Sequence, residues 1–252
     1  GKTKERVKSE EDPKVDFKAT YKGMFTSRPF ITAALSGILI SGQLQFASLN
    51  QYLYKNYFEN PNLGIWGTIA NYAPMAIMLF FTPKLSKKYG KKELCGIGTL
   101  LSSVTAIIMC ITMPMFERGA AEGQISIGMI MYLVYTFIIG IGYSFVSITT
   151  WAIVTDVIDY QEYKTGIRNE SAVYSAYTFG RQFGQAVADA GGLFLLQWAK
   201  YDSLTAGNGF IAENDTSKKI MFICTIIPAI VYTLVFILFK YLSLQTKINL
   251  KI

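Results

Sequence analysis

Polar side chains recur along one side of an otherwise apolar stretch between residues 171 and 199. They follow one another every three or four residues, which is the spacing of neighbours on one face of an α-helix. The side chains are Tyr174, Thr178, Arg181, Gln185 and Asp189, and Gln182 lies next to them. Hydroxyl, amide and guanidinium groups on one face can donate and accept several hydrogen bonds to a single polar ligand.

Arg181 is the charge in this group that needs the most explanation. An Arg about eleven residues into a helix lies about 16 Å deep at 1.5 Å per residue. That is near the middle of a bilayer, where a cation facing lipid costs several kcal/mol. We therefore expect the face to line a wet cavity, to which Trp151 adds an aromatic surface. The alternative is an internal pair with Asp189, although the two residues are about 12 Å apart along the helix axis.

The sequence offers little for catalysis or for a resident metal. It contains no His, and its three cysteines, Cys95, Cys110 and Cys224, lie inside apolar stretches without metal-ligand spacing. It has no nucleophile elbow, phosphate-binding loop or dinucleotide fingerprint. We expect no enzymatic activity, no cofactor and no metal site.

The composition predicts an all-α membrane protein. Apolar residues make up 51% of the chain and charged residues 16%, whereas a soluble domain has about 25% charge. Six apolar stretches each approach the roughly 20 residues that a membrane-spanning helix needs. They cover approximately residues 30–54, 62–83, 94–115, 125–155, 171–199 and 219–242.

Lysine and arginine predict the orientation. They concentrate before residue 29, in Lys84–Lys92, near 164–168 and after residue 239, and they are sparse in the other connections. We expect a cytoplasmic segment at 1–28, a six-helix transmembrane bundle at 29–243 and a cytoplasmic tail at 244–252. This bias accounts for the net charge of +7, so nucleic-acid binding is not expected.

The segment 156–170 is a dense cluster of both charge signs, and we interpret it as a hairpin at the membrane surface. One hypothesis is a solvated helix end. The other is an ionic latch that pairs with a second half of the protein when the inner side of the cavity is closed. Its members would be Asp156, Asp159, Glu162, Lys164 and Arg168.

Four segments resemble the glycoside–pentoside–hexuronide:cation symporters, the melibiose-permease-like branch of the major facilitator superfamily. Thr3–Val7 is similar to the start of that family's central loop, and Leu85–Lys92 to its basic loop between the second and third helices of a half. Asp156–Arg168 and Ala172–Arg181 are similar to the region around its tenth and eleventh helices. The resemblance covers the C-terminal half of such a transporter.

The resemblance implies secondary transport of a sugar or glycoside coupled to Na⁺ or H⁺ across the plasma (inner) membrane. Its implied partners are the sugar, the lipid bilayer and an N-terminal six-helix half, which would hold most of the cation site. The implied substrate-binding residues are Trp151, Tyr174, Thr178, Arg181, Gln182 and Gln185. Gln182 departs from the family, where a Lys is common, so charge coupling at that position is in doubt.

Two other functions fit the same sequence. A truncated half could act as a membrane scaffold without transporting anything, and a related fold could move an amphiphilic, lipid-like solute. The polar face around Arg181 favours a sugar over a lipid. Gly180 and Gly184 are expected to permit close packing with a neighbouring helix, or less directly to support a rocking motion.

Overall fold

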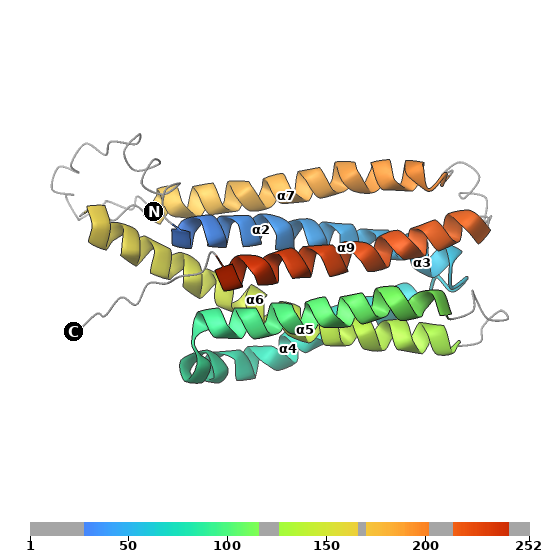
Figure 1. Ribbon diagram of the computed structural model, residues 1–252, viewed down its shortest axis with the longest axis horizontal. Coiled ribbons are helices and arrows are strands. Elements are labelled where there is room, and N and C mark those ends of the chain that lie inside the picture. Colours follow the sequence, from blue (N-terminus) through green and yellow to red (C-terminus); the bar gives the residue numbers. More distant parts are fainter. Residues whose placement is uncertain (1–27, 116–125, 166–169, 202–213, 242–252) are drawn as a thin grey trace, which may run out of the picture.

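The protein forms a bundle of six long helical segments that run side by side along one axis (Figure 1). The structure is a computed structural model that describes residues 28–115, 126–165, 170–201 and 214–241. The elements are α2 (Arg28–Phe46), η1 (Ala47–Leu49), α3 (Asn50–Asn56), α4 (Leu63–Tyr89), α5 (Lys91–Thr112), η2 (Met113–Met115), α6 (Ile127–Thr165), α7 (Glu170–Trp198) and α9 (Asn214–Tyr241). No strand occurs among these residues, and the all-α prediction is confirmed.

Five of the segments are long and apolar enough to cross a membrane. The first is continuous from Phe30 to Asn56, because η1 and α3 prolong α2. The sixth, α7, has 29 residues but is less apolar, since it carries Arg181, Asp189 and several amides. The polar face predicted from the sequence is therefore what separates α7 from the other five helices.

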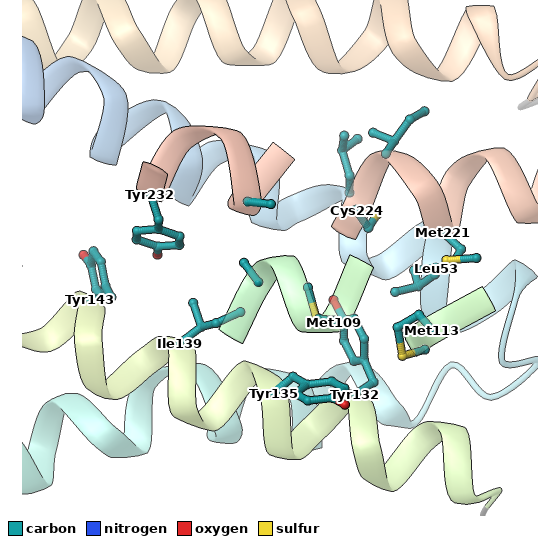
Figure 2. Close-up of a cluster of buried hydrophobic side chains, with 14 of the residues drawn as sticks. Leu53, Met109, Met113, Tyr132, Tyr135, Ile139, Tyr143, Met221, Cys224 and Tyr232 are labelled. Carbon is teal, nitrogen blue, oxygen red and sulfur yellow. The ribbon is translucent and has the colours of Figure 1, made fainter. Parts of the chain in front are cut away.

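The helices form two groups that α9 joins. α2 packs along α7, while α6 packs against both α4 and α5, and α9 contacts both α2 and α5 (Figure 1). The core between α3, α5, α6 and α9 holds buried aliphatic, thioether and aromatic side chains. In Figure 2, Tyr143 of α6 and Tyr232 of α9 lie across from one another in this core.

Glycines make close contacts between helices, as expected for the pair at 180 and 184. A Cβ atom on Gly184 would collide with the backbone carbonyl oxygen of Ile38 on α2, and Gly180 also packs against Ile38. Gly142 of α6 meets Gly98 of α5 in the same way. Backbones that approach this closely gain dispersion contacts along the whole helix face, which is the usual basis of helix association in membranes.

Two segments predicted as connections are mostly helical. The basic stretch Lys84–Lys92 is divided between α4 and α5 by Gly90 alone, whose φ of 95° ends α4. α6 continues through the charged segment as far as Thr165, so the hairpin predicted for 156–170 is wrong over most of its length. No Gly or Pro interrupts residues 143–165, and the first Gly comes only at position 166.

Some predicted features lie outside the described residues. These are Arg168, nearly all of the segment 1–28, and the tail 244–252. Lys164 belongs to α6, but its side chain is not described.

The contact between α2 and α7 can be tested with two glycine variants. Gly184→Ala should destabilise the purified protein, because the new methyl group meets backbone rather than a movable side chain; overpacking of this kind costs about 1–3 kcal/mol. Gly96→Ala is the control, since a Cβ there meets nothing within 4 Å. Unfolding in detergent measures both variants. Equal stability of the two would contradict the packing described here.

Candidate functional site

Trp151 of α6 and Arg181 of α7 meet halfway along the bundle. The guanidinium carbon of Arg181 lies 5.6 Å from the centre of the Trp151 ring, which is within the range of a cation–π interaction. On its other side Trp151 packs edge-to-face with Tyr177, with ring centres 5.7 Å apart and planes at 76°. This places a cation beside an aromatic surface inside the helix bundle.

A small pocket surrounds this group, and we call it the Arg181 pocket. α2, α6 and α7 all contribute to its wall. Its polar side chains are Ser36, Tyr143, Ser147, Thr150, Tyr177 and Arg181. Its volume of about 40 Å³ has room for a few water molecules and not for a sugar ring. The described residues thus form a small polar pocket between three helices.

Ser41 of α2 fixes the turn that carries Arg181. Its hydroxyl donates a hydrogen bond to the backbone carbonyl of Arg181 at 2.8 Å. That carbonyl and Gly184 lie on the side of α7 that touches α2. Because the backbone is held on this side, the Arg181 side chain leaves α7 at its edge, half-buried and directed at Trp151.

The predicted substrate-binding residues divide into two groups. Trp151 and Arg181 line the pocket together, whereas Tyr174, Thr178, Gln182 and Gln185 do not. Gln185 is half-buried one turn beyond Arg181, while Thr178 and Gln182 are exposed. Asp189 is also exposed and two turns away, and it makes no ion pair with Arg181. Their roles in binding remain predictions.

Several pocket residues were not singled out from the sequence. Tyr177 is buried between Trp151 and α2, and Tyr143, Ser147 and Thr150 precede Trp151 on α6. A signal was available, because positions 143, 147 and 151 are successive turns of one helix face. Tyrosines and hydroxyls within apolar spans are common packing residues, however, so only the position of Trp151 draws attention to them.

At the end of the bundle nearest the described N-terminus, Asp156 of the predicted latch forms an ion pair with Lys91. Lys91 Nζ contacts both carboxylate oxygens of Asp156, at 2.6 and 2.8 Å, and donates to the carbonyl of Ala152 at 3.2 Å. α5 is therefore attached to α6 one turn from Trp151. The predicted pairing of Asp156 with a second half of the protein stays a prediction, and within this chain its partner is Lys91.

Comparison with known proteins identifies the family. A family model described as "MFS/sugar transport protein", where MFS denotes the major facilitator superfamily, matches residues 2–246. The chain belongs to this family. The resemblance seen in the sequence is thus confirmed, and the long apolar helices of this chain are those of an integral membrane protein.

Three relatives illustrate the range of this sugar-transport family. An uncharacterised symporter of Bacillus subtilis is 30% identical over 73% of this chain and 38% of its own length. An isoprimeverose transporter of Lactiplantibacillus pentosus is 25% identical over 75% of this chain and 37% of its own length. A glucuronide carrier protein homolog of Escherichia coli is 29% identical over 54% of this chain and 25% of its own length. The matched part of the chain covers less than half the length of each of these relatives.

The ion pair between α5 and α6 should contribute modestly to stability. Its side chains are 37% and 45% exposed, and pairs this exposed contribute about 0.2–1 kcal/mol. A double-mutant cycle with Lys91→Ala and Asp156→Ala should give a coupling free energy in that range. The same cycle with Lys92→Ala should be additive. Additivity in the Lys91 cycle would show that this contact does not stabilise the protein.

Proposed function

We propose that this chain is the C-terminal half of a secondary transporter that moves a sugar or glycoside together with Na⁺ or H⁺. The support is the family itself, the six long helices, and a match that covers less than half the length of the relatives described above. A second six-helix half would face this one across a central cavity and supply the other wall of the Arg181 pocket. Most of the cation site would lie in that half.

The observation that carries the proposal is the position of Arg181 against Trp151. The Arg181 guanidinium has no carboxylate partner among the described residues, and the Trp151 ring is 47% exposed. A guanidinium offers up to five N–H donors in a fixed plane, while an aromatic face stacks on the apolar side of a sugar ring. The pair would hold sugar hydroxyls, and it would equally hold the carboxylate of an acidic sugar.

Orientation follows from the same proposal. With lysine and arginine kept on the cytoplasmic side, the end of the bundle that carries Lys91 and Asp156 faces the cytoplasm, together with both ends of the chain. The opposite end, with α3 and the start of α4, faces outward across the plasma membrane. A purely lipid-like substrate is less consistent with a pocket that contains a cation and several hydroxyls.

The acidic residues at the end of α6 would serve as a latch. Asp159 and Glu162 lie on the helical extension beyond Asp156. We expect them, with Lys164 and Arg168, to pair with the other half when the cytoplasmic side is closed. Pairs of this kind contribute little individually. A transition between two states that differ by a few kcal/mol needs only several of them.

Substitution of Arg181 tests the proposed function directly. In the full-length transporter, Arg181→Ala should weaken sugar binding roughly ten- to hundredfold, because hydrogen bonds to a charged group contribute about 1.5–3 kcal/mol. Arg181→Lys should retain part of the affinity by keeping the charge. Binding of isoprimeverose, melibiose, xylose, galactose and glucuronate is measured by calorimetry.

Gln197→Ala provides the control, since Gln197 is an exposed polar residue at the far end of α7. It should bind like the wild type. Wild-type affinity in Arg181→Ala, at normal expression, would show that this residue does not contact the substrate.

Removing the latch charges should favour the state that is open to the cytoplasm. Asp159→Asn combined with Glu162→Gln should raise the access of an impermeant thiol reagent, applied from the cytoplasmic side, to a cysteine introduced at exposed Thr178. At about 0.3–1 kcal/mol per pair, the rise is about two- to fivefold for each pair lost. Asp215→Asn, at the other end of the bundle, should leave access unchanged. If access is unchanged in the double variant, the latch hypothesis is wrong and these residues form only a solvated helix end.

A further inference from the structure

A second cavity lies between α3 and the first turns of α4, at the end of the bundle away from Lys91 and Asp156. It has a volume of about 250 Å³, near the lower end of the roughly 300–1,000 Å³ usual for small-molecule sites. Its polar lining consists of Ser48, Asn50, Gln51, Tyr54, Thr68, Asn71 and Tyr72. We call it the amide groove. None of its lining residues carries a formal charge.

Two glycines of α4 leave space for polar side chains of α3. Gln51 reaches over Gly64, where an added Cβ would lie 2.6 Å from its Oε1 atom, and the hydroxyl of Tyr54 occupies the space next to Gly67. Any larger residue at position 64 or 67 would push these polar ends out. The two helices are thus spaced so that hydrogen-bonding groups, not aliphatic ones, fill their contact.

The amides in this region have unused hydrogen-bonding capacity. The side chains of Asn50 and Asn71 make no hydrogen bond to another described residue. Both also line a smaller, inner pocket with Gln43, whose Oε1 atom is buried and has no partner among the described residues. Within a membrane-spanning bundle an unpaired amide is costly. Three such groups from two helices indicate a hydrogen-bonding occupant.

The groove and the Arg181 pocket lie along the same face of the first span. On this span the pocket is lined by Ser36, Ile40 and Leu44. The groove is lined by Leu44, Ala47 and Gln51. These positions are successive turns of one helix face. Leu44 belongs to both cavities and separates them. A ligand held at Trp151 and Arg181 would therefore reach the groove by extending past a single leucine side chain.

We propose that the amide groove binds the neutral second sugar unit of a glycoside. This inference rests on the proposed function. Amides and hydroxyls both donate and accept, as sugar hydroxyls do, and the half-exposed Tyr72 ring provides an apolar face. A lipid chain fits the groove poorly, because Leu44 and Ala47 are its only aliphatic lining residues, and no carboxylate of the described residues lines it for a cation. The Arg181 pocket then takes one end of the substrate and the groove takes the other.

Matched pairs of sugars test the proposal in the full-length transporter. Calorimetry compares isoprimeverose with xylose, and melibiose with galactose, for the wild type, Asn50→Ala and Asn71→Ala. Each variant should weaken disaccharide binding about tenfold and leave monosaccharide binding within about twofold. Gln45→Ala is the control and should bind both kinds of sugar like the wild type. Gln45 is an amide of the first span, as Asn50 is, and it lines neither the groove nor the inner pocket.

An equal loss for both members of a pair would overturn the proposal, since a packing defect acts on any ligand. A wild type that binds only monosaccharides would overturn it as well and leave the proposed function intact. A wild type that binds no sugar, whether of these pairs or glucuronate, would overturn both.

A cysteine at exposed Ser48 gives a second measurement that does not depend on removing an amide. Saturating disaccharide should slow its reaction with an impermeant maleimide, and saturating monosaccharide should not. A labelling rate that the disaccharide leaves unchanged would show that the groove stays empty of sugar.

Discussion

A guanidinium halfway along an apolar helix bundle is the constraint that most of this structure serves. A cation at that depth requires water, an aromatic surface or a counter-charge. Here α6 supplies the surface as Trp151, and α2 fixes the turn of α7 through the hydrogen bond from Ser41. Both depend on the close approach of α2 and α7, which requires glycine at position 184. The packing between α2 and α7 therefore also orients the Arg181 guanidinium.

The sequence predicts what depends on one helix at a time. Length and hydropathy give the six spans, glycine spacing gives the contact between α2 and α7, and the depth of Arg181 places it at mid-bundle. The ends of helices are less predictable. Charges near Asp156 and Lys91 are equally compatible with a surface connection or a helix that extends beyond the bilayer, because both are solvated. Only the fold shows that these two residues, 65 positions apart, form an ion pair.

The site itself is less predictable than the helices, and for a physical reason. A pocket in a bundle is assembled from faces of three or four helices, while sequence periodicity describes one face at a time. Tyr143 and Tyr177 look like packing residues within apolar spans, and both line the Arg181 pocket. Thr178 shares the predicted polar side of α7 but stands exposed, because α2 packs against the side of α7 that carries Tyr177, Gly180 and Gly184. A small rotation of a helix about its own axis decides which of these residues faces the cavity.

The short 3₁₀ segment η1 explains why the amide groove lies on the same side as the Arg181 pocket. A 3₁₀-helix advances about 120° per residue and an α-helix about 100°. The three residues Ala47–Leu49 therefore add about 60° of rotation between Leu44 and Asn50. In an uninterrupted α-helix, Asn50 would stand about 120° away from Leu44 around the axis. The tighter winding reduces that angle to about 60°, which brings the amide toward the face that Leu44 shares with Arg181. A local change in helix type thus joins the neutral and the cationic surfaces into one continuous lining.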